Sequence, residues 1–579
     1  MKRIAFVFLA FFIAPLMVSL SNPLFASQQL PYNPPGLYAD SVEKALQLSD
    51  DDIDLATAVL LIGKRWDPSI NIEYYRGRID EISLTVLDRL NGRSPLSNSR
   101  RTVQIINKLL FDELGFSPVE NADNPQDLFL NSVLDNKKGY CLSLSVLYLS
   151  IAERLELPVY GVVVPGHFFV RYADKDSSFN IETTQKGASP PDGHYIKEFK
   201  VPQDKQQAVY LRNLGKKETI GCFFNNLANV YFDLNDIENA YYYQQRAVDI
   251  NPLLAEARTN LGNILLKKNM VDSAIQQYRA ALKINSTDAK THHNLANAYS
   301  KNGLSDDAIE QYNIALNLDP NFIEIYKGLA QVYHSKGLTD KAIDILKKAI
   351  DINSRDAEIY TTLAGIYQDK QNYDQAISNY RLALTFKNDS IPAAYGLAYA
   401  YFQNQMYYDA IEQFRALLFY EPDNAKAYFG LGLTYNKLGW AEDEIAAYQN
   451  AIKADPNMVA AWQNLAQAYM SRKQYALAVQ MYQQVIRQSP PADVFYNLAV
   501  AYSLLKEYSE AQKYYLKAVE LQPNYPAAHN NLAITFYMLH QYEQALKHAE
   551  IAKEQGFEVS SDLLEQLHKI LGVKVETEN

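Results

Sequence analysis

The sequence has few of the residues on which disulfide-rich folds and β-rich folds depend. Only 2 of its 579 residues are cysteine, which excludes a scaffold held together by many disulfides. Glycine and proline number 23 each, beside 43 tyrosines, and this argues against a compact all-β protein with many tight turns. A chain of this length is also too long for one hydrophobic core. We therefore expect a mainly helical protein of several domains or an extended repeat array.

No basic block interrupts the chain, whose formal net charge is −11. Nucleic acid is therefore a poor candidate partner, because the binding of phosphates needs a basic face. The nine histidines are scattered, and the pair His292 and His293 lacks the neighbouring ligands of a metal site. The sequence also has no glycine-rich loop for phosphates. We expect neither a metal ion nor another cofactor.

The N-terminal segment has a composition of its own. Residues 1–26 have a basic start, an apolar middle and a small-residue end, the pattern of a secretory signal that is cleaved after Ala26. A cleaved signal predicts a periplasmic or secreted protein. The alternative is an uncleaved N-terminal anchor, because the apolar stretch nearly reaches membrane-spanning length before Asn22. No later stretch is apolar for long enough to span a bilayer.

From about residue 217 onward the sequence repeats itself with a period of 34. A leucine followed by a small residue recurs ten times, and every step is 34 residues except one of 33. An aromatic residue usually follows three positions after the small residue, and a proline is common near the end of each unit. Small residues let two helices approach closely and proline stops the second helix, so each unit predicts a helix pair. The leucines are Leu227, Leu261, Leu295, Leu329, Leu363, Leu397, Leu431, Leu465, Leu498 and Leu532.

This pattern resembles the tetratricopeptide repeat (TPR). The resemblance implies an α-solenoid of ten helix pairs over residues 217–557, followed by a capping helix over residues 558–572 that covers the last apolar edge. It also implies a concave face built from the first helix of each pair, a surface suited to an extended peptide or protein partner.

Six units carry an asparagine directly before the leucine. A side-chain amide offers both a donor and an acceptor, so a row of asparagines can pair with a peptide backbone of any sequence. The resemblance implies this use, because some TPR proteins hold a bound chain at this position; the alternative is that asparagine is simply frequent there. Gly328, Thr362, Gly396 and Gly430 interrupt the row, which favours two shorter binding stretches. The asparagines are Asn226, Asn260, Asn294, Asn464, Asn497 and Asn531.

The first half of the chain predicts helices followed by strands. Apolar residues at helical spacing predict helices over residues 52–66, 73–92, 100–116 and 124–136. A dense apolar run then predicts a buried helix that begins at Cys141. Short stretches rich in β-branched and aromatic residues follow, and they predict strands over residues 158–165, 167–172 and 179–183.

A thiol, an imidazole and a carboxylate arrive from these consecutive elements. Cys141 would lie at the positive end of a helix dipole, which favours a thiolate. His167, at the start of one strand, could accept its proton, and Glu182, on the neighbouring strand, could orient the imidazole. Adjacent antiparallel strands can hold such a pair side by side.

The stretch KKGYCLSLSVLYLSIAERLELPVYGVVVPGHFFVRY, together with NIETTQKG, resembles the transglutaminase-like superfamily. It is most similar to the SirB1-like branch, in which DLATAVLLIGKRWDPSINIEYYRGRIDEI also has a counterpart, so the resemblance covers roughly residues 50–250. It implies a papain-like α+β domain over residues 41–200. Cys141 would be the nucleophile, His167 the base, and Glu182 would replace the usual aspartate. Many SirB1-like proteins lack the cysteine, and this chain retains it.

Each of these residues also has a simpler interpretation. Cys141 could be a small buried hydrophobic residue or could form a disulfide with Cys222. We do not expect the disulfide, because it demands a specific geometry and would need the first repeat helix to fold onto the site. The backbone N–H of Cys141 is the natural oxyanion donor and Tyr140 a second candidate. We expect hydrolysis of an amide rather than cross-linking, because no amine site is visible. The rival hypothesis is a non-catalytic adaptor with a vestigial triad.

Overall fold

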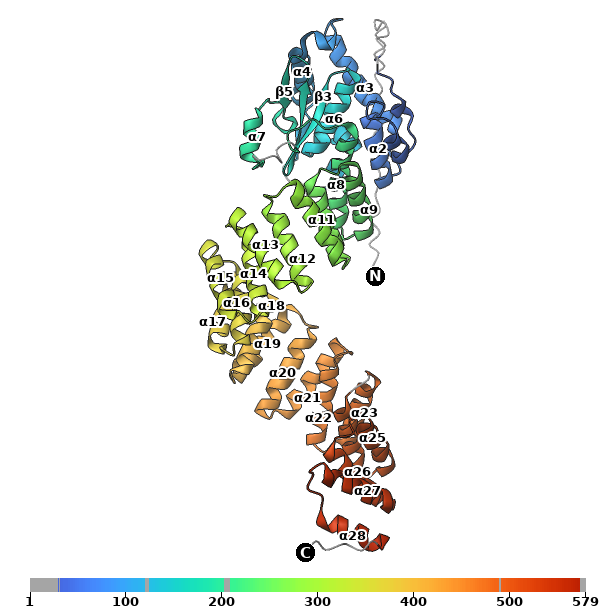
Figure 1. Ribbon diagram of the computed structural model, residues 1–579, viewed down its shortest axis with the longest axis vertical. Coiled ribbons are helices and arrows are strands. Elements are labelled where there is room, and N and C mark those ends of the chain that lie inside the picture. Colours follow the sequence, from blue (N-terminus) through green and yellow to red (C-terminus); the bar gives the residue numbers. More distant parts are fainter. Residues whose placement is uncertain (1–29, 31, 120–123, 203–208, 489–490, 573–579) are drawn as a thin grey trace, which may run out of the picture. The chain divides into compact units, whose positions relative to one another are not determined.

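A computed structural model describes residue 30 and residues 32–119, 124–202, 209–488 and 491–572. The expected signal segment up to Ala26 lies outside these residues. Contacts between residues divide the chain into two compact units, one up to Phe322 and one from Ile323 onward. The first unit therefore contains the N-terminal mixed domain together with the first three helix pairs of the repeat region (Figure 1).

The N-terminal domain begins with helices where the sequence has apolar residues at helical spacing. Four of the α-helices have side-chain caps; in two of these, Asp54 accepts a hydrogen bond from the N–H of Thr57 and Asn71 accepts one from that of Tyr74. The predicted helix over residues 100–116 is α-helical only at first and then continues as a π-helical turn. In order, the elements are η1 (Pro35–Tyr38), α1 (Val42–Gln47), α2 (Leu55–Trp66), α3 (Ile72–Arg89), η2 (Pro95–Asn98), α4 (Ser99–Asn107), η3 (Lys108–Glu113), η4 (Pro125–Leu128) and α5 (Leu130–Asn136).

A three-stranded antiparallel sheet follows helix α6 (Cys141–Arg154), as the sequence predicts. The strand order is β3, β4, β5, and Val164 at the end of β3 pairs with His167 at the start of β4. Gly166 makes the tight turn between them at a φ of +74°, a conformation that favours glycine. Helix α6 packs against β3 and β4 (Figure 1). The remaining elements are β1 (Ser117–Pro118), β2 (Lys138–Gly139), β3 (Val159–Val164), β4 (His167–Ala173), β5 (Ser178–Ile181), η5 (Thr183–Gln185) and α7 (Asp192–Glu198).

Buried charge fixes helix α6 against the helices before it. The guanidinium of Arg154 is completely buried, and it forms ion pairs with Asp54 at 3.3 Å and with Asp80. Desolvation offsets much of the attraction in such pairs, so their main effect here is to orient the helices. Arg154 thereby ties the C-terminal end of α6 to α2 and α3.

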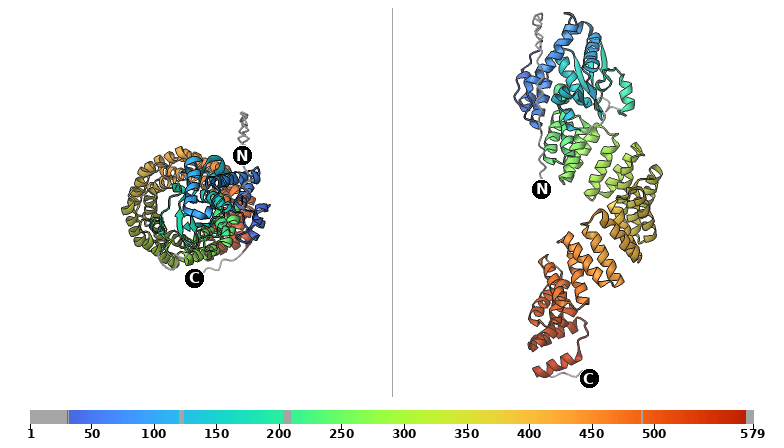
Figure 2. Two further views of the ribbon diagram at one scale, coloured as in Figure 1. Left: turned by 90° about the horizontal axis from the view of Figure 1, so that it is seen from above. Right: turned by 180° about the vertical axis from the view of Figure 1, so that it is seen from behind.

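The first repeat helix, α8 (Lys216–Asp233), is attached directly to this domain. The carboxylate of Asp50 accepts hydrogen bonds from the backbone N–H groups of Lys216 and Lys217, which are unpaired donors at the helix start. The Lys216 ammonium lies 3.2 Å from Glu153 of α6, and Leu214 bridges to Gly161 of β3. Helix α8 therefore packs beside α2 (Figures 1 and 2).

The rest of the first unit consists of antiparallel helix pairs. Small residues at fixed places let the two helices of a pair approach closely; examples are Ala228 on α8 and Ala240 on α9, both fully buried. The helices after α8 are α9 (Ile237–Ile250), α10 (Ala255–Lys267), α11 (Val271–Ile284), α12 (Ala289–Lys301) and α13 (Ser305–Leu318).

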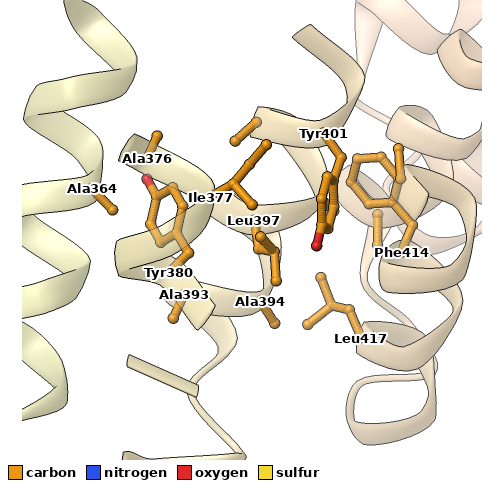
Figure 3. Packing of buried hydrophobic residues seen from close by; sticks show 14 of the residues in the cluster. Ala364, Ala376, Ile377, Tyr380, Ala393, Ala394, Leu397, Tyr401, Phe414 and Leu417 are labelled. Atoms are coloured by element: carbon orange, nitrogen blue, oxygen red, sulfur yellow. The ribbon is translucent and has the colours of Figure 1, made fainter. Parts of the chain in front are cut away.

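The second unit continues the same repeat. Alternating small and large side chains fill its core, as where Ala364, Tyr380 and Leu397 meet between neighbouring helices (Figure 3). Its helices are α14 (Ile323–Ser335), α15 (Thr339–Ile352), α16 (Ala357–Asp369), α17 (Tyr373–Phe386), α18 (Ile391–Gln403), α19 (Tyr407–Tyr420), α20 (Ala425–Leu438), α21 (Ala441–Ala454), α22 (Val459–Ser471), α23 (Tyr475–Val485) with η7 (Ile486–Gln488), α24 (Ala492–Leu504), α25 (Tyr508–Leu521), α26 (Pro526–Met538), α27 (Tyr542–Glu554) and α28 (Ser561–Leu571).

The predicted fold class is confirmed: a mixed α/β region precedes the stacked helix pairs of a TPR solenoid. Helix α28 packs on α27 at the place expected for a capping helix. None of the helices in the described part of the chain combines the length and the apolar character that crossing a membrane requires.

Candidate functional site

Cys141 is the first residue of α6, so its backbone N–H is one of the donors that a helix start leaves unpaired. The thiol is only partly buried, in contrast to the helix that follows it. Tyr140 precedes it, and the Tyr140 hydroxyl donates a hydrogen bond to the carbonyl of Asn124. Because that donor is committed elsewhere, the Cys141 N–H is the better candidate to stabilise an oxyanion.

His167 begins strand β4 and contacts both other predicted site residues. Its Nε2 lies 2.8 Å from a carboxylate oxygen of Glu182, and the imidazole also hydrogen-bonds with the thiol of Cys141. Since Nε2 is used by Glu182, Nδ1 is the nitrogen left for Cys141. The ring stacks on Phe199 with centroids 4.8 Å apart, which fixes its plane. The structure therefore brings Cys141, His167 and Glu182 together in one row.

Glu182 lies one residue beyond the end of β5 and caps the short helix η5 rather than extending the strand. One carboxylate oxygen accepts hydrogen bonds from the N–H and hydroxyl of Thr184. The other accepts from the hydroxyl of Tyr195, at 3.1 Å, and faces His167. The side chain is almost fully buried, so these bonds hold it in one orientation.

Burial and hydrogen bonding act in opposite directions on the His167 and Glu182 pair. Burial disfavours the imidazolium, but the hydrogen bonds to Cys141 and Glu182 outweigh it and raise the pKa of His167 to about 10. Burial likewise disfavours the carboxylate, yet the bonds from His167 and Thr184 keep the pKa of Glu182 below its usual value. A charged pair is the stable state of this site at neutral pH.

A cavity of about 320 Å³ opens at Cys141 and His167. One wall belongs to the N-terminal domain and is mainly apolar, with Leu142, Val163 and Phe168. A second part of the lining belongs to the repeats and is mainly polar. Its residues are Asn225, Asn226, Asn229, Glu256, Thr259, Asn260, Asp288 and Lys290, from α8, α10 and the start of α12.

Cys222 of α8 lines the same cavity as Cys141. Helix α8 does fold onto the site, because Asp50 and Glu153 hold its start on the domain, yet the disulfide that we did not expect is not formed. Both thiols are free. Burial raises the pKa of Cys222 to about 12, so only one of the two cysteines has an imidazole partner and an accessible sulfur.

All six predicted asparagines lie on the first helix of their helix pair, and all are half-buried. In the first unit, Asn226 and Asn260 line the cavity, and Asn294 donates to Asn263 at 2.9 Å. In the second unit, Asn531 donates to the hydroxyl of Tyr496. The positions in the second unit are Asn464 on α22, Asn497 on α24 and Asn531 on α26.

Several residues at the site have no clear sequence signal. Tyr195 lies on α7, an element that the apolar pattern does not predict, and it contacts Glu182 only through the fold. Glu256 is reached by the hydroxyl of Tyr210, and its second carboxylate oxygen is buried without a partner in the described structure. Thr184 is the exception. It lies two residues after Glu182, a spacing at which the Glu side chain can accept a hydrogen bond from the backbone N–H of the threonine.

The described residues contain no group of three or more His, Cys, Asp or Glu side chains that could hold a metal ion. In the repeats, His292 instead takes part in a hydrogen bond: its Nδ1 lies 2.8 Å from the amide oxygen of Gln311. The thiol of Cys141 beside the imidazole of His167 can support nucleophilic chemistry at a sulfur atom.

Models of known protein families match both the N-terminal domain and the repeat region of the chain. Residues 73–198 match the model of the transglutaminase-like superfamily. TPR models match residues 223–252, 262–303, 306–337, 425–458, 445–493, 492–525 and 514–547, and the C-terminal ARM domain of tetratricopeptide repeat protein 21 matches residues 328–427. The chain carries a transglutaminase-like core domain followed by multiple TPR repeats, a repeat class that binds proteins and peptides.

Individual relatives match the first part of the chain. A UPF0162 protein of Xylella fastidiosa (strain 9a5c) is 27% identical over 231 residues, which covers 36% of this chain and 76% of that protein. A UPF0162 protein of Pseudomonas aeruginosa is 25% identical over 207 residues and covers 36% and 75%. Among solved structures, a TPR protein of Parabacteroides merdae is 17% identical with a TM-score of 0.33, covering 43% of this chain and 98% of that one.

Proposed function

We propose that the protein binds an extended peptide or protein partner on its repeats and acts on an amide bond through the thiol of Cys141. The observation that carries the proposal is the continuous contact from Cys141 through His167 to Glu182 at the edge of one cavity. Adjacent thiol, imidazole and carboxylate groups are what nucleophilic catalysis at a carbonyl requires.

The proposed reaction proceeds in two steps. The Cys141 sulfur attacks the amide carbonyl carbon, a C–S bond forms, and the backbone N–H of Cys141 binds the oxyanion. His167 passes a proton to the leaving nitrogen as the C–N bond breaks, which leaves a thioester. Water attacks the thioester carbon, His167 takes a proton from the water and passes it to the sulfur as the C–S bond breaks, and a carboxylic acid and the free thiol are produced. An amine in place of water would give transfer instead.

Two cysteines in one cavity provide an internal control for the nucleophile. We expect iodoacetamide to alkylate Cys141 rapidly at pH 7 and to spare Cys222, whose pKa of about 12 keeps it protonated. Peptide mapping by mass spectrometry measures the two rates separately. His167→Ala should slow alkylation of Cys141 by on the order of tenfold or more, because the imidazole that holds the thiolate is lost.

His194→Ala is the matched control for this substitution. His194 is a neighbouring histidine on α7, half-exposed and paired with Glu198 rather than with the cysteine. Its removal should leave the rate for Cys141 unchanged. If Cys141 instead reacts no faster than free cysteine, or its rate is the same in His167→Ala, the binding-only adaptor replaces the enzyme.

The raised pKa of His167 predicts how the site responds to pH. A raised pKa stabilises the fold fully below the ordinary histidine value of 6.5, and this contribution fades as the pH rises to about 10. The lowered pKa of Glu182 contributes above the ordinary glutamate value of 4.5 and is lost as the pH falls through its folded value. The rate advantage of wild type over His167→Ala should therefore persist at neutral pH and disappear above about pH 10.

We also propose that residues 1–26 direct export to the periplasm or beyond the cell. Their basic, apolar and small-residue order supports this. The intact mass of the protein isolated from its native cells tests it: a chain that starts at Ser27 indicates cleavage after Ala26. A chain that retains Met1 in the membrane fraction indicates the uncleaved anchor, and a chain that retains Met1 in the cytoplasm contradicts both.

A further inference from the structure

The cavity at Cys141 takes its polar wall from the repeats. We propose that Asn226 and Asn260 on this wall bind the backbone of the same polypeptide whose amide Cys141 attacks. This inference rests on the function proposed above for Cys141. It adds the substrate class, which is an extended polypeptide recognised by hydrogen bonds to its backbone. Peptide binding by the repeats and reaction at Cys141 are separate predictions from the sequence. The inference joins them, because the polypeptide bound by the first repeats is then the substrate.

A hydrogen-bond network fixes how the asparagine amides point. The Nε2 of the fully buried Gln244 donates to the backbone carbonyl of Ala257 at 2.9 Å, which identifies that atom as the nitrogen. The same nitrogen donates to the Oδ1 of Asn225 at 2.9 Å. The Asn225 Oδ1 also accepts from the Nδ2 of Asn260 at 3.0 Å, and the Asn225 Nδ2 donates to the Oδ1 of Asn226 at 3.4 Å.

The network leaves one group free on each cavity asparagine. Within the described residues, no hydrogen bond uses the Nδ2 of Asn226 or the Oδ1 of Asn260, and both side chains are half-exposed on the cavity wall. One residue thus presents a donor and the other an acceptor. Because Gln244 and Asn225 fix these orientations before binding, little side-chain freedom is lost when a ligand arrives.

A polypeptide backbone has the complementary groups. Each peptide unit carries one N–H and one C=O, so an extended chain can accept from Asn226 and donate to Asn260 whatever its side chains are. Glu256, Asp288 and Lys290 share this wall, so charges of both signs line it and neither sign dominates, which suits an uncharged peptide backbone. Val163 and Phe168 line the same cavity, where they can contact apolar side chains of the same polypeptide.

The probe for this inference is a pool of ten-residue peptides of random sequence, each with a chloroacetyl group on a central side chain. Free chloroacetamide is the comparison reagent, because it reports on the thiol alone. The rate of labelling at Cys141, divided by the rate for chloroacetamide, measures backbone recognition. Two lost hydrogen bonds should lower this ratio by about tenfold in Asn226→Ala/Asn260→Ala, while the chloroacetamide rate stays constant.

Asn464→Ala/Asn497→Ala is the matched control, because it changes the same repeat position on α22 and α24 of the second unit. This control should keep the wild-type ratio. A second measurement needs no mutation: a peptide pool with N-methylated backbones lacks the N–H donors and should lose most of its advantage on the wild-type protein. It therefore tests the inference even if the alanine variant does not fold.

The outcomes separate the two proposals. If chloroacetamide reacts with Cys141 no faster than with free cysteine, the proposed nucleophile fails. If chloroacetamide reacts well but the peptide pool has no advantage, the nucleophile stands and backbone recognition is overturned. A peptide advantage that survives both the Asn226→Ala/Asn260→Ala change and N-methylation also overturns it.

Discussion

A tyrosine at the same repeat position borders a glycine in each unit, but the glycine lies at a different place in the repeat. Tyr278 of α11 lies against Gly262 of its own pair, and its hydroxyl donates to Asn263 at 2.7 Å. Asn263 also accepts from Asn294, which occupies the position before the repeated leucine in the next pair. Tyr380 of α17 instead lies against Gly396, which occupies that position itself (Figure 3 labels Tyr380 and Leu397).

The aromatic rings explain two of the four interruptions of the asparagine row, those at Gly396 and Gly430. A Cβ atom added to Gly396 would overlap the ring of Tyr380, and one added to Gly430 would overlap Phe414. An asparagine has no room there, because the aromatic ring fills the space. Where a glycine follows the leucine, as at Gly262, the ring of Tyr278 borders that glycine, and Asn294 occupies the position before the next leucine. The last repeats show that this glycine is not obligatory, since Ala466 and Ala499 occur with Asn497 and Asn531.

The two units also differ in the environment of one glutamate position of the repeat. Glu256 on α10 and Glu358 on α16 occupy the same place in their repeats. Burial raises the pKa of Glu256 to about 7, whereas the hydrogen bond from Lys327 lowers the pKa of the exposed Glu358. Of these two glutamates, Glu256 lies at the cavity wall beside the N-terminal domain. Its burial there explains why its pKa shifts in the opposite direction to that of Glu358.

The largest expected effect comes from filling the interrupted position. Gly396→Asn should destabilise α17 and α18 by about 3 kcal/mol, because the added side chain and the Tyr380 ring need the same space. Hydrogen exchange measured by mass spectrometry gives the free energy of local opening for these helices. Unchanged protection would mean that the ring can move aside, and the explanation for the interrupted row would then be wrong.

The reciprocal change concerns the first unit. Gly262→Ala should destabilise α10 and α11 by about 2 kcal/mol, because the new methyl group meets the ring of Tyr278. It should also weaken the contact of Asn263 with Asn294, since Tyr278 then moves off Asn263. Hydrogen exchange in α12 detects the second effect. Loss of stability without any change at α12 would separate the tyrosine packing from the asparagine row.

A smaller effect, dependent on pH, is expected at Glu256. The unfolded chain ionises near the ordinary value of 4.5 and the folded chain near 7, so stability is lost as the pH rises between these values. Glu256→Gln removes that loss and should stabilise the first unit by about 1 kcal/mol at pH 8, with no gain below pH 4.5. Calorimetry over this pH range measures it. The matched control Glu358→Gln should give no gain at pH 8; an equal gain would contradict the role of burial.

The smallest effect is expected at a glycine with open space. At Gly365 the nearest atom to an added Cβ would be the Tyr380 hydroxyl at 3.8 Å, an ordinary contact. Gly365→Ala should therefore stabilise α16 by about 0.5 kcal/mol through helix propensity. Chemical denaturation measures the gain. A loss comparable to that of Gly262→Ala would show that the repeat helices tolerate no added methyl group at all.

Much of the fold could be predicted because it is encoded locally. The period of 34 and the small residues at fixed places predict the helix pairs, and the apolar spacing predicts α2 and α3 within a few residues. The candidate site was also within reach, since a helix start, a strand start and a strand end carry Cys141, His167 and Glu182. Whether these three residues catalyse a reaction stays a prediction.

The remaining parts depend on contacts between residues that are distant along the chain. Tyr195 and Phe199 reach the His167 and Glu182 pair from α7, a helix too short for its apolar pattern to stand out. The π-helical turn η3 is equally unmarked in the sequence. Such features follow from the space that other elements leave, which no local propensity contains.

The sequence by itself determined the repeat, its helix pairs and the three residues of the candidate triad, because periodic packing and short-range order are written in local spacing. Only the tertiary structure decided that α8 folds onto the domain, where Asp50 pairs with two backbone N–H groups of the helix start. That contact puts Asn226, Asn260 and Cys141 around one cavity. The physical reason is that hydrogen bonds between distant segments form only once both are folded, so their partners cannot be read from either segment alone.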